Sequence, residues 1–258
     1  KASSLEAQGP VYAGTTLEVK TSGASSNRQS LAARDRISLS AGGQLTNSGI
    51  IEAGVNADNS RNSVGDISLS AQNLRNSGSV TASRNLDAGV SQTLDNRGGT
   101  LSAQNGVQVS AATLDNREQG RVLSHNSLTL HADQVLNQQG LINSRGPLQA
   151  QVGHLDNRQD GRVSATGDLD LSVTHLDNQG GELIAQGNLN LTGTTLDNRH
   201  NGLLGAANVL TVQVDTVDNR GGELSSSAAL NLSGQQLNNS DGGKVLAGTD
   251  LSLGVAQL

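Results

Sequence analysis

The sequence predicts an all-β chain, folded as a right-handed parallel β-helix of about twelve coils with 20 to 21 residues each. A sequence phrase recurs with that period, and apolar residues alternate with polar ones inside it. Alternation at every second position is typical of a half-buried strand, because successive side chains of a strand point to opposite faces. A unit of this size cannot bury its apolar face alone, so we expect each coil to stack on the next.

The composition supports the same fold, because large side chains are missing. The chain has 258 residues, with 32 Gly, a single Tyr, and no Cys, Met, Trp or Phe. A compact globular core of this size ordinarily fills irregular gaps with aromatic and sulfur-containing side chains. Thin, identical layers need only Leu, Val, Ile and Ala. We therefore expect one β-helical repeat segment over residues 1–258, although length alone would suggest about two domains.

The triplet Leu-Asp-Asn, as in Leu94-Asp95-Asn96, marks one corner of each predicted coil. Stacked Asn side chains can hydrogen-bond to one another and satisfy corner backbone groups that no strand reaches. We therefore predict a structural asparagine ladder rather than a ligand site. Its members are Asn27, Asn47, Asn76, Asn96, Asn116, Asn137, Asn157, Asn178, Asn198, Asn219 and Asn239.

Two further segments complete each coil. A Gly-x-apolar-x-small segment such as residues 181–185 follows the triplet, and an alternating segment such as residues 189–191 leads to the next one. Each coil therefore supplies about three short strands, and about twelve coils at the usual strand spacing make a rod roughly 55–60 Å long. Equivalent apolar residues should stack in columns, one with Val163, Leu183, Leu204, Leu224 and Val245, another with Leu171, Leu191, Val212, Leu232 and Leu253.

The turn after the triplet alternates in length. A Gly follows the asparagine by three residues after Asn96, Asn137, Asn178 and Asn219, but by four after Asn116, Asn157, Asn198 and Asn239. The true period over this stretch is therefore two coils, or 41 residues. We expect the two turn lengths to let consecutive turns interleave.

One coil breaks the period, because the step from Asn47 to Asn76 is 29 residues. The extra residues predict a polar loop insertion at 54–66. Insertions into solenoids are favoured places for recognition, but they also cost little free energy, so a solvated loop that binds nothing is the favoured interpretation. If the loop contacts a partner, the candidate residues are Asn56, Asp58, Asn59, Arg61 and Asn62.

Two of the five histidines, His154 and His175, share one register on neighbouring coils, with Asp156 and Asp177 nearby. Such a pair could bind a transition metal weakly. Most other coils place Thr or Gln at this position, so a simple outward polar row explains it better. We therefore expect no metal site and no cofactor.

The carboxylates of the triplet form a second row that alternation directs outward. Parallel β-helices include polysaccharide lyases and hydrolases that use carboxylates, so such an enzyme is the alternative function. Here the acids repeat without a unique cluster, which favours charge neutralisation along a stacked surface and predicts no enzyme and no catalytic residue. The row contains Asp95, Asp115, Asp156, Asp177, Asp197 and Asp218, with Arg97, Arg117, Arg158, Arg199 and Arg220 two residues after most of them.

Charge and hydropathy exclude two further classes of partner. A net charge of −6 and a single aromatic residue leave neither a basic stripe nor a stacking platform for nucleic acid. No apolar run approaches the roughly 18 residues that span a bilayer, so we expect no transmembrane segment.

The phrases Leu196-Asp197-Asn198-Arg199, Gly222-Glu223-Leu224-Ser225 and Gln186-Gly187-Asn188-Leu189-Asn190-Leu191 strongly resemble haemagglutinin repeats. These repeats occur in the large exoproteins of Gram-negative two-partner secretion systems. The family includes filamentous haemagglutinin adhesins and the CdiA-type toxins of contact-dependent growth inhibition, and the resemblance covers nearly the whole chain.

The resemblance implies a non-enzymatic, monomeric rod from a longer secreted exoprotein on the bacterial outer surface. Its implied partners are an outer-membrane two-partner-secretion transporter and a receptor on a host or target cell. The adhesin branch and the toxin branch both stay open, and so does the choice between a segment that binds and one that only spaces other domains.

Overall fold

The computed structural model describes residues 2–258, so Lys1, the first residue of the expected segment, lies outside the described residues. All regular secondary structure in this range is β-strand, and the strands of successive coils pair in parallel. The predicted fold class is thus confirmed as a parallel β-solenoid of about twelve coils. The chain divides into two compact units, unit 1 up to Thr129 and unit 2 over Leu130–Leu258.

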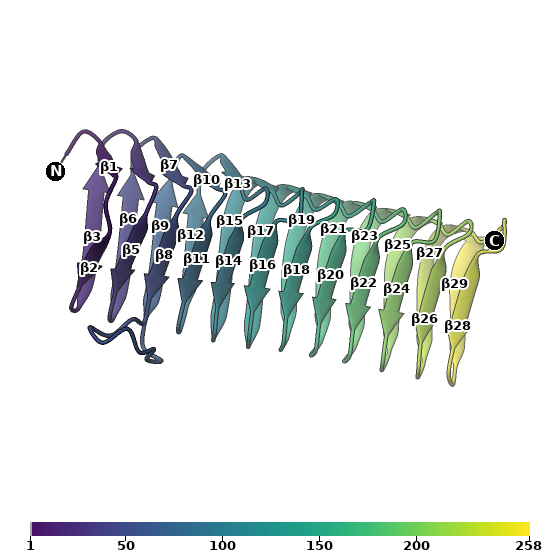
Figure 1. The fold of residues 1–258 in the computed structure, drawn as a ribbon. Helices are drawn as coiled ribbons and strands as arrows, with labels where there is room; N and C mark the ends of the chain where they lie inside the picture. Colours follow the sequence, from purple (N-terminus) through teal and green to yellow (C-terminus); the bar gives the residue numbers. More distant parts are fainter. Residues whose placement is uncertain (1) are drawn as a thin grey trace. The chain divides into compact units, whose positions relative to one another are not determined.

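Unit 1 begins with coils of three strands, as predicted. Its strands are β1 (Leu5–Ala7), β2 (Val11–Ala13), β3 (Thr16–Thr21), β4 (Ser25–Asn27), β5 (Ser30–Ala33), β6 (Arg36–Ala41), β7 (Gln44–Asn47), β8 (Ile50–Ala53), β9 (Asp66–Ala71), β10 (Asn73–Asn76), β11 (Ser79–Ala82), β12 (Leu86–Val90), β13 (Thr93–Asp95), β14 (Thr100–Ala103), β15 (Gly106–Asp115), β16 (Arg121–Ser124) and the start of β17 (Ser127–Leu136). Figure 1 shows these strands side by side along the unit.

Unit 2 builds each coil from one long and one short strand. After β17 come β18 (Leu141–Ser144), β19 (Leu148–Asp156), β20 (Arg162–Ala165), β21 (Leu169–Asp177), β22 (Glu182–Ala185), β23 (Leu189–Asp197), β24 (Leu203–Ala206), β25 (Leu210–Asp218), β26 (Glu223–Ser226), β27 (Leu230–Asn238), β28 (Lys244–Ala247) and β29 (Leu251–Gln257).

The expectation of about three strands per coil is therefore wrong from β15 onward. In these coils the alternating segment and the triplet join into one strand, because pairing continues across the corner between them. The ladder from β19 to β21 omits only Gly153 and its counterpart Thr174. The glycines at 42 and 43 instead separate β6 from β7 in unit 1.

The two predicted inward columns are present, in register, on opposite walls of unit 2. Val163 pairs with Leu183, and the column continues through Leu204 and Leu224 to Val245. The second column runs in the same way from Leu171 to Leu253. Their members are buried except in the last described coil, where Val245 is half-buried and Leu253 is exposed.

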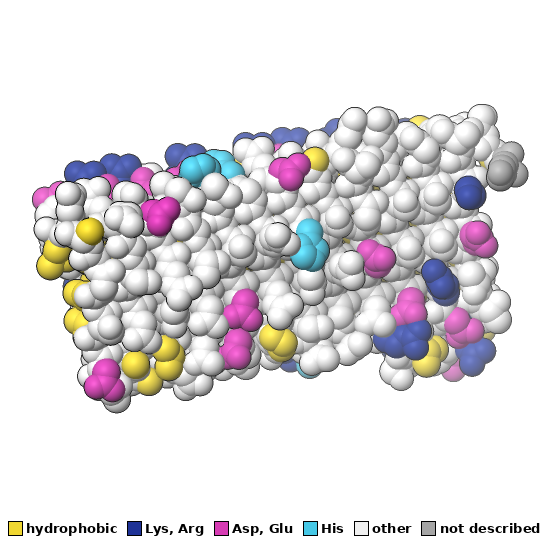
Figure 2. Space-filling view, turned by 180° about the vertical axis from the view of Figure 1, so that it is seen from behind, with side chains coloured by type: hydrophobic (Ala, Val, Ile, Leu, Met, Phe, Trp, Pro, Cys, Tyr) yellow, Lys and Arg dark blue, Asp and Glu magenta, His cyan; other side chains and the backbone are white. Residues whose placement is uncertain are grey.

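The core of each unit is aliphatic, since Leu, Val, Ile and Ala supply its buried apolar side chains, and few hydrophobic side chains show on the face drawn in Figure 2. Within residues 2–258, no helix has the length and apolar character needed to cross a bilayer.

Candidate functional site

The asparagines of the triplet contact one another along each unit, just before the turn. In unit 1 the Nδ2 of each donates to the Oδ1 of the next at 2.8 Å, through Asn27, Asn47, Asn76, Asn96 and Asn116. In unit 2 the same bonds of 2.7 to 2.8 Å run through Asn137, Asn157, Asn178, Asn198, Asn219 and Asn239. All are buried except Asn239, which is half-buried.

The second N–H of these amides is used as well. Asn157 Nδ2 also donates to the carbonyl oxygen of Glu182 at 3.2 Å, and Asn198 Nδ2 to that of Glu223 at 3.2 Å. An asparagine amide has two N–H donors, and each of these finds an acceptor in the next coil. The contribution of this row to stability stays a prediction.

The alternating turn lengths correspond to two backbone conformations. The three-residue turns place one residue at positive φ, as at Gly180 with φ 64°, which is the requirement of a type II turn. The four-residue turns place two consecutive residues there, as at His200 and Asn201 with φ 55° and 65°, which is the requirement of a type I′ turn. The closing hydrogen bonds come from Gly181 N to Asn178 O at 3.0 Å and from Gly202 N to Arg199 O at 3.2 Å.

Consecutive turns of unit 2 bond to each other rather than collide. The backbone N of Asn201 donates to Gly221 O at 2.9 Å, one coil further along. The glycine that closes each turn lies against the previous coil, so a Cβ at Gly181 would stand 1.9 Å from Asn157 O. Only glycine fits so close to a backbone carbonyl. Close packing against the previous coil therefore fixes the position of each of these turns.

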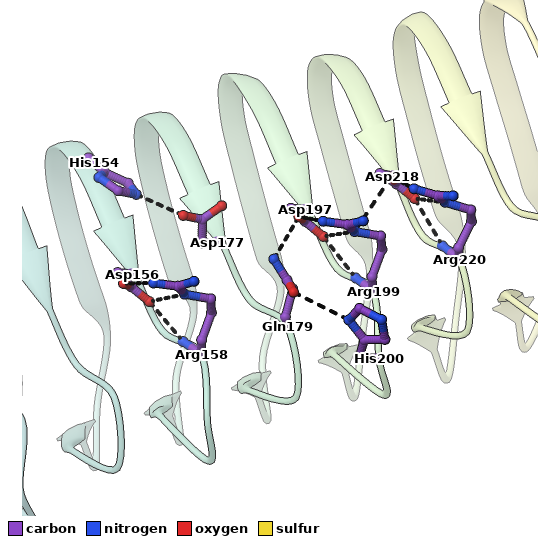
Figure 3. A network of polar contacts seen from close by, with 10 residues as sticks. All are labelled: His154, Asp156, Arg158, Asp177, Gln179, Asp197, Arg199, His200, Asp218 and Arg220. Carbon is purple, nitrogen blue, oxygen red and sulfur yellow. Dashed lines mark hydrogen bonds and ion pairs between the residues drawn. The ribbon is translucent and has the colours of Figure 1, made fainter.

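Each aspartate of the triplet that has an arginine two residues later forms a clamp within its own coil (Figure 3). Arg199 donates from Nε to Asp197 Oδ1 at 2.9 Å and from Nη2 to Asp197 Oδ2 at 2.7 Å, and its backbone N also donates to Oδ1. The same three bonds repeat at the other Asp-x-Arg coils, Asp95–Arg97, Asp115–Arg117, Asp156–Arg158 and Asp218–Arg220.

These clamps change two expectations about the carboxylate row. Charges are neutralised mainly within a coil, although weaker contacts such as Arg199 Nε to Asp218 Oδ2 at 3.6 Å also join neighbouring coils. The row also points outward without being freely exposed, since Asp156 is 3% exposed and Asp115 is buried as well. The arginine of each clamp lies over its own aspartate and shields it from solvent. The alternation of apolar and polar residues does not predict this shielding.

The clamps also set the acidity of their carboxylates. Hydrogen bonds from Arg97 and Arg220 hold the pKa of Asp95 and Asp218 below the ordinary value, because they stabilise the charged form. Burial raises the pKa of Asp156, but the hydrogen bonds and charge of Arg158 outweigh it and the net shift is downward. These carboxylates are therefore ionised at neutral pH.

The clamp is missing at Asp177, because Gln179 occupies the place of the arginine. Asp177 Oδ2 instead lies 3.0 Å from Nε2 of His154 on the preceding coil, and Gln179 Nε2 donates to Asp197 Oδ2 at 2.8 Å (Figure 3). The substitution of Arg by Gln at position 179 is visible in the sequence and was the available signal for this exception. The histidine partner could not be read from it.

The two histidines lie next to each other, as their shared register predicts. His154 pairs with His175 in the β19–β21 ladder, and their ring centroids are 6.5 Å apart. His175 Nδ1 lies 2.9 Å from Thr195 Oγ1. Among residues 2–258, no three His, Asp or Glu side chains form a group that could hold a metal ion.

Residues 54–65 lie between β8 and β9, and β9 begins at Asp66, the last residue of the expected loop. Of the candidate contact residues, Asp58, Asn59 and Arg61 are exposed, while Asn56 and Asn62 are half-buried. Asn62 Nδ2 donates to Asn56 Oδ1 at 3.0 Å, and Arg61 Nε lies 2.6 Å from Glu52 Oε1. Arg61 Nη1 also donates to Asn59 O at 2.9 Å. The structure thus brings all but Asp58 into contacts with each other or with the coils.

A family model for the haemagglutinin repeat matches residues 2–78, 52–193 and 189–255. No match was found to a curated protein or to a solved structure. The matched residues cover nearly the whole chain and include the asparagine row, the turns and the clamps described above. The chain belongs to the haemagglutinin repeat family.

Proposed function

We propose that this chain is a non-enzymatic segment of a secreted filament on the outer surface of a Gram-negative bacterium. The observation that carries the proposal is the haemagglutinin repeat match over nearly the whole chain. Members of this family are typically secreted, surface-exposed proteins. The coil geometry supports the same role, because a stack of like coils extends a surface without requiring a unique site.

The chain is proposed to be monomeric and to form one uninterrupted series of repeats. The spacing of the triplets supports this, since Asn116 and Asn137 are 21 residues apart, and one family match runs over residues 52–193. Sedimentation equilibrium tests the oligomeric state directly. The mass of a single chain is expected at every concentration, and a mass that rises with concentration would refute the proposal.

The segment is proposed to present binding or effector regions located elsewhere in its parent exoprotein. In that role the parent protein leaves the cell through an outer-membrane two-partner-secretion transporter and contacts a host or neighbouring bacterium. An adhesin and a contact-dependent growth inhibition toxin would both use such a stalk. The sequence that adjoins this segment in the parent distinguishes them, because the toxin branch ends in a C-terminal effector.

A deletion of two whole coils distinguishes a segment that only spaces other domains from one that itself binds the target cell. Removal of residues 158–198 joins Asn157 to Arg199 and keeps both the register and the alternation of turns. A spacer should tolerate this change, so bacteria that display the shortened parent should attach to target cells as before. Loss of attachment by a folded, displayed variant would place a binding site within the deleted coils.

The alternative function, a β-helical polysaccharide lyase or hydrolase, needs a carboxyl group that can exchange a proton near neutral pH. The clamped carboxylates are poorly suited to that role, because arginine bonds lower the pKa of Asp95, Asp156 and Asp218. Incubation with a panel of bacterial and host glycans, with and without calcium, should release no new chain ends. Sustained release by the purified chain would favour the enzyme.

A further inference from the structure

Residues 54–65 of unit 1 touch coils on both sides of the one that carries them. Four successive coils are identified here by their short strands, β2 in coil 1, β5 in coil 2, β8 in coil 3 and β11 in coil 4. The segment leaves coil 3 after Ala53 and rejoins the stack at Asp66. In Figure 1 it is the excursion below the strands of unit 1.

Towards the lower-numbered coils, the segment is held at three points. The hydroxyl of Tyr12 in coil 1 donates to the carbonyl oxygen of Val55 at 3.3 Å, a contact that passes over coil 2. Asn62 Nδ2 donates to Arg34 O, next to coil 2, at 3.0 Å. The backbone N of Val55 donates to Ala33 O at 3.1 Å, and the Val55 side chain is buried, with 6% of the residue exposed.

Towards coil 4, the segment is held by its end. Gly65 N donates to Ser83 Oγ at 2.9 Å, and Arg84 N donates to Gly65 O at 2.8 Å. Asp66 forms an ion pair with Arg84, whose Nε donates to Asp66 Oδ1 at 2.7 Å. Hydrogen bonds from Arg84 lower the pKa of Asp66, so the pair is charged at neutral pH.

The segment is also closed on itself. Asn62 N donates to Gly54 O at 2.9 Å, and a Cβ at Gly65 would stand 2.1 Å from Gly54 N, so the two ends meet. Within the tip, Asn56 N donates to Ser60 O and Asn56 Nδ2 to Ser60 Oγ, both at 2.9 Å. A segment with this many internal bonds keeps one shape and can transmit a constraint from one anchor to another.

We infer that residues 54–65 are a strap that fastens four coils of unit 1 so that they open together. In a solenoid each coil contacts only its neighbours, so coils can separate one at a time from an opened end. The Tyr12–Val55 bond adds a contact between coils that are not neighbours. The single aromatic residue of the chain is thereby assigned the role of anchor. The inference does not depend on the proposed function.

Hydrogen exchange measured by mass spectrometry on the full chain tests the strap. In the excised variant, residues 54–66 are replaced by Arg-Asp-Arg, the connection that this chain uses between Ala33 and Ile37. The coils should still form, but the amides of β2 and β5 should exchange at least tenfold faster, while those of β14 and β16 keep their rates. In the unaltered chain β2, β5, β8 and β11 should exchange as one group.

Two point variants keep the test valid if the excised variant fails to fold. Tyr12→Phe removes only the anchoring hydroxyl and should speed exchange in β2 severalfold. Asn73→Ala is the matched control, because its bond to Gln92 joins neighbouring coils at an exposed position, and it should leave β2 unchanged. Unchanged β2 exchange in Tyr12→Phe, or an equal effect of Asn73→Ala, would overturn the inference.

Discussion

Asn157 donates from Nδ2 to the Oδ1 of Asn178 across 2.8 Å, and both side chains are fully buried. Each buried asparagine in the interior of the row therefore acts as donor to one neighbour and acceptor from the other. The donors all point towards the higher-numbered coil, so the amides of each unit form one directed chain of hydrogen bonds. A polar column thus runs beside an otherwise aliphatic core.

Replacing one member of this row should be costly. Asn157→Ala removes one acceptor of Asn137 Nδ2, which also donates to Arg162 O, and the donor to Asn178 Oδ1, both in buried positions. An unsatisfied buried polar group costs about 1–3 kcal/mol, so urea denaturation should show a loss of at least about 1 kcal/mol. Asn190→Ala is the control, since its bond to Asp170 joins two residues that are only half-buried. Equal, small effects of the two variants would count against a structural ladder.

The closing glycine of each turn should not tolerate a methyl group. In Gly181→Ala the new Cβ would stand 1.9 Å from Asn157 O, whereas in Gly205→Ala the nearest atom lies at 3.9 Å. Overpacking of this kind costs about 1–3 kcal/mol. Thermal denaturation should therefore separate the variants clearly, with Gly205→Ala close to the unaltered chain. A Gly181→Ala variant of undiminished stability would contradict the close approach.

Gln139 has a left-handed backbone conformation in which its counterparts are glycines. It has φ 60° in a three-residue turn, where the equivalent residues of other coils are Gly98, Gly180 and Gly221. A side chain in the left-handed region costs roughly 1 kcal/mol relative to glycine. Gln139→Gly should therefore raise the free energy of unfolding by about 0.5–1 kcal/mol, while Gln151→Gly on β19 should lower it. A destabilised Gln139→Gly variant would show that side-chain contacts outweigh the strain.

The alternation of turns predicts which deletions the chain tolerates. Removal of the two coils 158–198 leaves a four-residue turn between three-residue ones, whereas removal of one coil, 158–178, places two three-residue turns side by side. The second deletion removes Asp160, whose backbone N donates to Gly180 O at 3.0 Å, and puts no four-residue turn in its place, so one pairing between unlike turns is lost. Circular dichroism during heating should show a lower melting temperature for the one-coil deletion than for the two-coil deletion. The reverse order would mean that turn lengths do not matter.

The clamps should contribute stability that depends on pH. The pKa of Asp218 is lowered from 3.8 in the folded chain by hydrogen bonds from Arg220, so its contribution is present above the unfolded pKa and is lost as pH falls through the folded value. Arg220→Gln removes it. The difference in unfolding free energy between this variant and the unaltered chain should be largest above about pH 5 and shrink below about pH 3. A difference that is constant with pH would exclude the clamp as its source.

The regular repeat is the reason that the columns of the core and the asparagine contacts can be predicted from the sequence. Each column member has the same surroundings as its neighbours, so one register places Val163 or Leu191 on the inside of its coil without further information. The asparagine contacts follow from the same register. Repetition does not show whether another side chain shields an outward-pointing residue from solvent. The sequence pattern therefore does not predict the burial of Asp156 under Arg158.

The contacts that break the repeat are harder to predict from the sequence. The contact between His154 and Asp177 depends on a ring orientation across two coils, and the Tyr12–Val55 bond joins residues 43 positions apart with no periodic relation. The two strands merge across Gly153 in β19 and across Thr174 in β21, so no single residue type at the corner signals the merging. Such contacts are decided by local packing, which a single sequence does not specify.

As part of a secreted filament on the bacterial surface, this chain should be reachable from outside intact cells. The most direct measurement is immunogold labelling of intact, unpermeabilised cells that produce the parent protein, with antibodies raised against residues 1–258. Gold particles are expected at and beyond the outer membrane, and they should be lost when the outer-membrane transporter is deleted. Labelling that appears only after the cells are permeabilised, with or without the transporter, would contradict that location.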